Sequence, residues 1–469
     1  MAILTKYILK YRLSDDETLL INSLTSAKDI IDNETRIKIE NMEKGIVNID
    51  DEKDAELFNQ LKGRGYLFDS IEDEQTTIKK YEIMNNELAK RRKNTSFTIC
   101  PTMGCNLRCV YCFESDNQHL DCSVMTDDQL DGIFKYITQK LTEYKDLDEN
   151  HKKLLQMPTI NLFGGEPLLN PNFHVVERIF EFASHNSIGI KIITNGTTIP
   201  FYSELLTKYK SSIIQIQVTV DGDEEIHNQR RIYANGKGTF DKICNNIDKI
   251  LEIGIRVTLR INVDKINIST LHNLEKIIRD KKWNENNLFF PYASPVLDFD
   301  GTGTNILTEH EMLDTLLNKG YYGAEESFIK HIIACSIGFS QTFFDEKYKM
   351  KPWKMDYCEA TTCSNFCFTP DGKITTCLTY VGKGNNVIGT FDKDGVKLNP
   401  EKFKLWSERT IFRLDSCREC KYAFMCGGGC PVSALEQNKD IDKVICSDIE
   451  KTLERYVYYM KDKILQGGE

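Results

Sequence analysis

The sequence contains no apolar stretch long enough to cross a bilayer. Its richest run, "SSIIQIQVTV" at residues 211–220, is short and is interrupted by glutamines. The first residues, "MAILTKYILKYRL", lack the long apolar segment and the small-residue cleavage site of a secretion signal. We therefore expect a cytoplasmic protein that has no membrane partner.

Basic residues are also in the minority. The chain has 60 Lys and Arg against 70 Asp and Glu, which gives a formal net charge of −10. Because a nucleic-acid-binding surface usually carries a basic excess, we expect no nucleic-acid partner. The remaining composition, 41% hydrophobic and 28% charged over 469 residues, is that of an ordinary globular chain. This length predicts roughly two to four domains.

Cysteine is absent from the first 99 residues, although the whole chain contains 16. Four lie within residues 100–112, only three within 113–357, and nine within 358–446. In a chain without a secretion signal, such clusters indicate metal ligands and argue against disulfides. The distribution predicts two metal-binding regions in different domains.

The cysteine-free N-terminal part has a pattern of its own. "KYILKYRL" and "ETLLINSL" predict a β-hairpin, and two short helices follow. The second helix is expected to begin near Asp51, with apolar contacts from Ala55, Leu57, Phe58 and Leu61. "GRGYLF" then predicts a turn and a strand, which completes the outline of a small winged helix. The polar stretch "DEQTTIKKYEIMNNELAKRRKN" predicts a helical linker.

From residue 96 the sequence alternates between short β-branched runs and amphipathic stretches. The runs "SFTIC", "TINLFGG", "IKIITNG", "IQIQVTVDG", "IRVTLRINV" and "NLFFPYAS" predict buried parallel strands. The clearest intervening helix begins at Thr126, where Gln129 completes a capping box. Repeated strand–helix alternation predicts an α/β sheet with its chemistry at the C-terminal strand ends.

Four motifs follow the first four of these strands. They are Cys105, Cys109 and Cys112 in "CNLRCVYC", then "GGEP", "TNG" and "DG". Because the C-terminal ends of parallel strands meet at one edge, we expect the four motifs to converge. A closed zinc site is typically four-coordinate, so three thiols leave one position of a metal centre open.

The C-x3-C-x2-C spacing, with Tyr111 before its last cysteine, and "FGGEP" at residues 163–167 resemble the radical S-adenosylmethionine (SAM) superfamily. The resemblance implies a partial (β/α)6 barrel, similar to a TIM barrel. It also implies that the three thiolates hold a 4Fe–4S cluster, whose fourth iron is chelated by SAM. The implied SAM-binding residues lie at the strand ends: Gly164, Gly165, Glu166, Asn195, Thr219 and Arg260.

The C-terminal pattern of cysteines resembles the SPASM domain, which implies two auxiliary 4Fe–4S clusters and three clusters in all. The outer auxiliary cluster would be held by Cys417, Cys420, Cys426 and Cys446. The inner one would be held by Cys358, Cys377 and Cys430, with Cys363 as the fourth ligand and Cys367 as its alternative. CxxC pairs suit zinc equally well, so a zinc ribbon is the competing hypothesis. The remaining cysteines are expected to be buried or inert: Cys100, Cys122, Cys244 and Cys335.

Two groups of relatives within the resemblance suggest different substrates. Sulfatase-maturating enzymes, which make formylglycine, carry a general-base Asp directly after the cysteine of the "PDG…C" motif. This sequence has Leu378 there. Maturases of ribosomally made peptides commonly carry a winged helix that binds a leader peptide by strand addition. We therefore predict a maturase that forms a Cys thioether crosslink. Carbon–carbon crosslinking and sulfatase maturation are the alternatives, and an iron–sulfur electron carrier is the non-enzyme alternative.

The resemblance also implies the partners and the domain plan. The partners would be a precursor peptide with a leader and an electron donor of the flavodoxin or ferredoxin type, while the catalytic base is not identifiable. The expected domains are a winged-helix recognition element at 1–85, a linker at 86–95, a radical SAM core at 96–320, a bridging region at 321–350 and a SPASM domain at 351–469.

Overall fold

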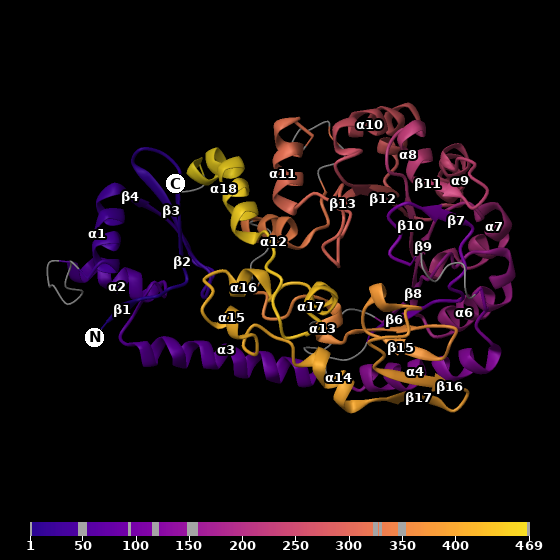
Figure 1. Cartoon of the computed structure of the whole chain (residues 1–469), viewed down its shortest axis with the longest axis horizontal. Helices are drawn as coiled ribbons and strands as arrows, with labels where there is room; N and C mark the ends of the chain where they lie inside the picture. Colours follow the sequence, from indigo (N-terminus) through magenta and orange to yellow (C-terminus); the bar gives the residue numbers. More distant parts are fainter. Residues whose placement is uncertain are drawn as a thin grey trace.

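The structure, a computed structural model, describes residues 2–45, 54–91, 95–114, 122–147, 158–321, 327, 331–345 and 353–466. Figure 1 shows the N-terminal strands at one end of the molecule and the main sheet at the other. The cysteine-rich C-terminal region lies between them.

A ten-stranded sheet organises the larger part of the chain, in the order β13-β12-β10-β9-β8-β6-β14-β15-β16-β17. All six predicted strands are present, and each runs parallel to its neighbours among the six. Their bounds are β6 Ser96–Ile99, β8 Thr159–Leu162, β9 Gly189–Thr194, β10 Ile213–Thr219, β12 Val257–Val263 and β13 Phe289–Pro295. The predicted α/β fold is therefore confirmed.

Amphipathic helices connect these strands and cover the sheet. The predicted capping box is present, because the Thr126 side chain accepts from Gln129 N and Thr126 N donates to Gln129 Oε1. Leu130 and Ile133 of this helix are fully buried in one core with strand residues such as Ile160. The helices are α4 Asp127–Lys145, α6 Phe173–His185, α7 Ile199–Lys208, α8 Glu224–Arg230, α9 Phe240–Ile253 and α10 Leu271–Asp280.

The cysteine-rich region continues the same sheet. Strand β14 (Asn365–Phe368) pairs in parallel with β6, and Thr98 Oγ1 donates to Asn365 Oδ1 over 3.0 Å. Three further antiparallel strands complete the sheet: β15 Lys373–Thr375, β16 Gly389–Asp392 and β17 Gly395–Leu398. The sequence did not predict this extension, and the expected boundary at residue 351 does not interrupt the sheet.

The N-terminal module contains the predicted hairpin, β2 (Ile8–Arg12) with β3 (Glu17–Asn22), and an unpredicted third strand, β4 (Lys28–Asp32). Phe58 and Leu61 of the second helix are buried against this sheet, while its expected start at Asp51 lies outside the described residues. The other elements of the module are β1 Ile3–Leu4, β5 Leu67–Phe68, α1 Asn33–Glu43 and α2 Ala55–Gly63.

A long helix, α3 (Ile71–Arg91), leads from this module along one side of the molecule, next to the cysteine-rich loops (Figure 1). Residues 86–91 of the expected linker at 86–95 thus belong to a helix that begins at Ile71. None of the helices within the described ranges is long and apolar enough to cross a membrane. The remaining elements are β7 Leu107–Cys109, β11 Arg231–Tyr233, α11 Glu309–Asn318, α12 Cys335–Phe344, α13 Glu359–Thr362, α14 Pro400–Ser407, α15 Asp415–Arg418, α16 Ala423–Cys426, α17 Pro431–Asn438 and α18 Ile449–Gln466.

Candidate active site

The cysteine triplet follows β6 and is fixed by main-chain hydrogen bonds. Strand β7, which ends at Cys109, pairs antiparallel with β11 and places Arg231 opposite Cys109. Val110 N donates to Arg230 O over 3.0 Å, and Cys112 N donates to Cys109 O over 3.1 Å in a turn. The loop therefore holds its shape through pairing with a segment about 120 residues later in the chain.

The three thiols lie close enough to influence one another. Burial raises the pKa of Cys105, and the Glu166 carboxylate and the thiols of Cys109 and Cys112 raise it further. Burial also raises the pKa of Cys112, to about 11. Among the described residues, no group of three or more His, Cys, Asp or Glu side chains converges on the position of a single metal ion.

The two glycines of "GGEP" allow the end of β8 to press against the cysteine loop. A Cβ on Gly164 would lie 2.5 Å from Thr102 O, and Gly164 has a φ of +118° that disfavours other residues. A Cβ on Gly165 would lie 2.3 Å from both Met103 O and Gly104 O. Any larger residue would force the strand end away from the loop that leads into Cys105.

Glu166 is a fully buried carboxylate at this junction. Its Oε1 accepts from Leu168 N over 2.9 Å and from Thr194 Oγ1 over 2.7 Å, and its Oε2 accepts from Asn195 N over 2.6 Å. Burial raises its pKa, and these hydrogen bonds lower it in part. Since each carboxylate oxygen can accept two hydrogen bonds, Oε2 has capacity for a further donor.

The other predicted SAM-binding residues lie at neighbouring strand ends. Asn195 Nδ2 donates to Asn106 Oδ1 over 2.8 Å and lies 3.8 Å from Cys105 Sγ. Thr219 and Arg260 are register partners on β10 and β12. Arg260 donates to Asn262 Oδ1 over 2.7 Å and to Ser294 Oγ over 3.1 Å. The structure thus brings all four motifs to one edge, as the parallel sheet predicted, while the SAM contacts stay predictions.

A buried network beside the triplet was not predicted. The Tyr111 hydroxyl donates to Asp221 Oδ2 and accepts from Arg231 Nη1 over 2.8 Å and from Asn262 Nδ2 over 3.0 Å. Arg230 lies over the Tyr111 ring, 4.9 Å from its centroid. The run "IHNQRR" at residues 226–231, after the "DG" strand end, is the part of the sequence that supplies both arginines of this region.

The residues present fit a negatively charged cofactor at the triplet. Arg231 is 8% exposed, and its Nε is buried without a hydrogen-bond partner among the described residues. Three thiols next to an arginine with an unused donor form a donor set suited to an iron–sulfur cluster. Cys105, Cys109 and Cys112 would hold this cluster, and Glu166 has acceptor capacity for an amino group.

The C-terminal thiols lie near one another in two sets, and the ligand roles that the SPASM resemblance implies for them stay predictions. Burial raises the pKa of Cys417 to about 12, and its thiol neighbours are Cys426, Cys420 and Cys446. This set is the predicted outer group. Short helices and turns carry it: α15, α16 and the loop that contains Cys446.

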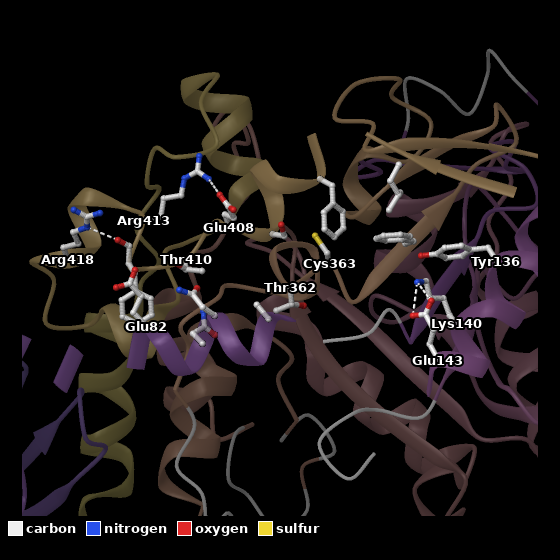
Figure 2. A pocket seen from close by; sticks show the side chains of 18 residues that line it. Glu82, Tyr136, Lys140, Glu143, Thr362, Cys363, Glu408, Thr410, Arg413 and Arg418 are labelled. Atoms are coloured by element: carbon white, nitrogen blue, oxygen red, sulfur yellow. Dashed lines mark hydrogen bonds and ion pairs between the residues drawn. The ribbon is translucent and has the colours of Figure 1, made fainter. Parts of the chain in front are cut away.

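The predicted inner group is also brought together, except at its fourth position. Burial raises the pKa of Cys358 to about 12, and its thiol neighbours are Cys377 and Cys430. Cys367 is fully buried next to Cys377. Cys363 Sγ instead lies 3.5 Å from Ala360 O, beside a groove of about 860 Å³ between α3, α4 and α14 (Figure 2). The fourth ligand therefore stays open between these two residues.

The remaining cysteines only partly match the expectation that they are buried or inert. Cys100 and Cys244 are buried, as predicted. Cys122 is exposed, so inertness is the part of the expectation that stays a prediction for it. Cys335 is partly exposed at the start of α12, and Cys430 and Tyr357 are among its electrostatic neighbours.

The comparison with protein families identifies the sheet domain. Residues 99–278 match the model of the radical SAM superfamily. The chain is 26% identical over 391 residues to the cysteine-type anaerobic sulfatase-maturating enzyme of Clostridium novyi, a match that covers 79% of this chain and 98% of that protein. It is also 23% identical over 311 residues to GTP 3′,8-cyclase of Listeria monocytogenes, over 64% of this chain and 83% of that one.

Solved structures match over more of the chain. The structure of native anSMEcpe with bound AdoMet and Kp18Cys peptide gives a TM-score of 0.58 at 18% identity, over 80% of this chain and 98% of that one. Streptococcus suis SuiB bound to precursor peptide SuiA gives 0.55 at 16% identity, over 96% of this chain and 99% of that one. The second match is long enough to include most of the N-terminal module. At these low sequence identities, the similarity shows a shared fold alone.

The residues matched by the superfamily model include the triplet and the three motifs that meet it at the sheet edge. The curated relatives named above, which match the chain over most of their own length, are enzymes. Residues 99–278 therefore form a radical SAM domain, and the chain is an enzyme whose cofactors are those of such domains, SAM and 4Fe–4S clusters.

Proposed function

We propose that this enzyme matures a ribosomally made precursor peptide and installs a crosslink from a Cys sulfur to a carbon atom of another residue. The observation that carries the proposal is the N-terminal module, which has an open sheet edge and lies in the same chain as the radical SAM site. A fold likeness that extends through this module to a protein solved with its precursor peptide supports it.

The module offers an edge for strand addition. Its sheet has the order β2-β3-β4, so β4 is a terminal strand within the described part of the module. Ile30 and Ile31 of β4 are half-buried. Ile30 packs against the large core, and Ile31 packs against the core of the module. A leader peptide that pairs with β4 gains main-chain hydrogen bonds with few demands on its sequence.

The module is fastened to the loop that carries the predicted outer cluster. Lys6 Nζ donates to Arg418 O over 2.9 Å and pairs with Glu419 over 2.7 Å. Tyr7 packs edge-on against Phe424, with ring centroids 5.5 Å apart. A leader that binds the module is therefore held near the auxiliary cysteines.

Three 4Fe–4S clusters complete the proposal, which corresponds to about twelve irons per chain. Cys105, Cys109 and Cys112 hold the SAM cluster, and the two C-terminal sets hold the auxiliary clusters. Bound SAM and a reduced cluster supply a 5′-deoxyadenosyl radical, which abstracts a hydrogen atom from an unactivated C–H bond. The chain positions the peptide and excludes water. A flavodoxin or ferredoxin-type protein serves as electron donor.

Sulfatase maturation is the second candidate, because a cysteine-type sulfatase-maturating enzyme matches this chain over nearly its whole length. Leu378 occupies the position of the general base of that group, and it packs against the buried cluster formed by Cys100, Met103, Cys367 and Val381. A leucine side chain cannot act as a general base, which favours the peptide maturase.

Competition with the isolated leader tests the role of the module. Tethering raises the concentration of the core peptide at the site to roughly millimolar, so modification of micromolar precursor should fall by about a hundredfold when free leader saturates the module. Ile30→Pro and Ile31→Pro remove main-chain donors that point to opposite sides of β4, so the variant whose lost N–H faces away from β3 should weaken leader binding. Lys397→Pro on the edge strand β17 is the matched control.

SAM cleavage without peptide should be unchanged in all three variants. Equal modification of leader-bearing and leaderless peptides would contradict the proposed module function. Conversion of a sulfatase peptide, but of no leader-bearing precursor, would favour the second candidate.

A further inference from the structure

Two consecutive arginines beside the triplet have very different surroundings. Arg230 is 1% exposed, and its guanidinium donates to Asp264 over 2.6 Å, to Asp221 over 3.3 Å and to Asn262 O over 3.1 Å. Its charge is therefore neutralised by two buried carboxylates. Arg230 therefore has a structural role at the sheet edge.

Arg231 is nearly as buried but has no comparable counter-charge. Among the described residues, the one hydrogen bond of its guanidinium runs from Nη1 to the Tyr111 hydroxyl over 2.8 Å, and its Nε is a buried donor without a partner. Within the described ranges, no carboxylate forms an ion pair with it at 4.0 Å or less. A buried cation without an anion is strongly unfavourable, so the functional state should supply one.

The position of Arg231 identifies the source of that anion. Arg231 is the register partner of Cys109 on the paired strands β7 and β11. Its guanidinium is tied to Tyr111, which lies between Cys109 and Cys112 in the sequence. Burial disfavours the charge of Arg231, but Cys109, Tyr111 and Asp221 raise its pKa, so the guanidinium stays charged.

We propose that Arg231 is a positioning and charge-compensating residue for the cluster held by Cys105, Cys109 and Cys112. The cluster takes one electron from an external donor, and the added negative charge lies beside the fixed guanidinium. Arg231 thereby favours the reduced state and raises the reduction potential. The inference rests on the proposed role of the triplet, but it needs neither the peptide nor the auxiliary clusters.

A redox titration of the reconstituted full chain tests this proposal. Electron paramagnetic resonance (EPR) follows the cluster whose signal changes when SAM is added, with dithionite as reductant. In Arg231→Gln the ratio of reduced to oxidised cluster at the wild-type midpoint should fall about tenfold, which corresponds to ~59 mV for a one-electron couple. Arg231→Lys, which keeps the charge, should stay close to the wild type.

Arg178→Gln is the matched control, because this arginine pairs with Asp127 and Asp131 on the outer helices. Its midpoint should not move. Arg231→Met keeps the aliphatic stem without the charge and provides a second neutral variant. If both neutral variants lose the cluster while Arg231→Lys retains it, the requirement for charge is supported. Loss from all three overturns the proposal, because shape would then be what matters.

An unchanged midpoint in Arg231→Gln would also overturn the inference. So would a loss of SAM affinity in the oxidised protein at an unchanged midpoint, since Arg231 would then act on SAM and not on the cluster. A wild-type protein without any SAM-sensitive signal would instead contradict the proposed role of the triplet. The two failures are thus distinguishable.

Discussion

The triplet and the C-terminal cysteines are held in place by different means. The triplet lies on a strand pair at the edge of a parallel sheet, beside a buried network of Tyr111, Asp221 and Arg230. Of the outer C-terminal set, Cys417 and Cys426 lie on helices of four residues each, Cys420 and Cys446 lie in loops, and three glycines with positive φ, Gly427–Gly429, follow Cys426. The first region is shaped by its own packing, whereas the second has little regular structure to shape it.

One side chain compensates for this difference in the C-terminal region. Arg409 is fully buried and donates to Ile441 O over 2.6 Å, to Gly429 O over 2.9 Å and to Gly428 O over 3.0 Å. Both regions thus contain a buried arginine. Arg409 holds the backbone together, whereas Arg231 has an unused donor next to the thiols. We therefore expect bound metal to contribute more to folding in the C-terminal region than at the triplet.

The largest expected effect comes from removing the triplet. Replacing Cys105, Cys109 and Cys112 by Ala should abolish 5′-deoxyadenosine production, because these three thiols are the proposed ligands of the SAM cluster. Circular dichroism should remain near that of the wild type, and most of the iron should stay on the C-terminal region. Continued SAM cleavage by this triple variant would show that the triplet is not the site. Cys244→Ala, on α9, is the control for loss of a buried thiol.

Removal of iron should separate the two regions. In chelated protein, amide hydrogens of residues 353–466 should exchange much faster, since metal binding there supplies folding free energy of several kcal/mol. Strands β6 to β13 should keep their protection. Uniform protection throughout the chain after chelation would mean that the C-terminal region folds without metal.

Replacing Arg409 by Met should disrupt the same region without touching the sheet. The change leaves several buried carbonyls without donors, and we expect a loss of about 2–5 kcal/mol in the stability of this region. The variant should lose the iron of the auxiliary clusters, while the SAM-sensitive EPR signal persists. Arg413→Gln, which removes partly exposed ion pairs with Glu408 and Asp442, is the matched control. Equal iron in both variants would refute the role of Arg409.

A smaller, pH-dependent effect is expected in the sheet domain at His227. Burial lowers the pKa of His227 to about 3, and its Nδ1 accepts from Asp221 N over 3.3 Å. Because the folded-state pKa lies below the unfolded value of about 6.5, its contribution is complete above pH 6.5 and declines as pH falls toward 3. The decline is ~1.4 kcal/mol per pH unit.

Denaturant unfolding of wild type and His227→Gln at several pH values measures this contribution. The difference between their free energies of unfolding should shrink by about 1.4 kcal/mol between pH 5.5 and 4.5. Parallel stability curves over that range would show that His227 does not titrate as its burial requires.

Much of the sheet domain could be predicted because its signals are local. Six β-branched runs gave six strands, and parallel geometry alone placed Cys105, Glu166 and Asn195 together. The division of the C-terminal thiols into two sets, by contrast, came from the resemblance to the SPASM domain. Each strand and each motif at a strand end is defined by residues within one short segment.

What could not be predicted depends on distant contacts. Strand β14 has only four residues and pairs with β6 about 270 residues earlier, which no local pattern reveals. Arg409 binds main-chain carbonyls, which are present at every position and leave no sequence signal. Arg231 becomes noticeable only when its neighbour Arg230 is seen to occupy the nearby carboxylates. The exposure of Cys122 likewise depends on how its loop packs.

Mass spectrometry of a precursor peptide tests the central claim most directly. The enzyme would be co-expressed with a leader-bearing, cysteine-containing peptide encoded beside its gene, and the peptide would then be isolated and fragmented. We predict a product lighter by a pair of hydrogen atoms, with one cysteine resistant to alkylation and bonded to another residue. The same peptide should be unmodified with the triplet variant. An unmodified peptide with the intact, SAM-cleaving enzyme, or a formylglycine in place of the crosslink, would contradict the account.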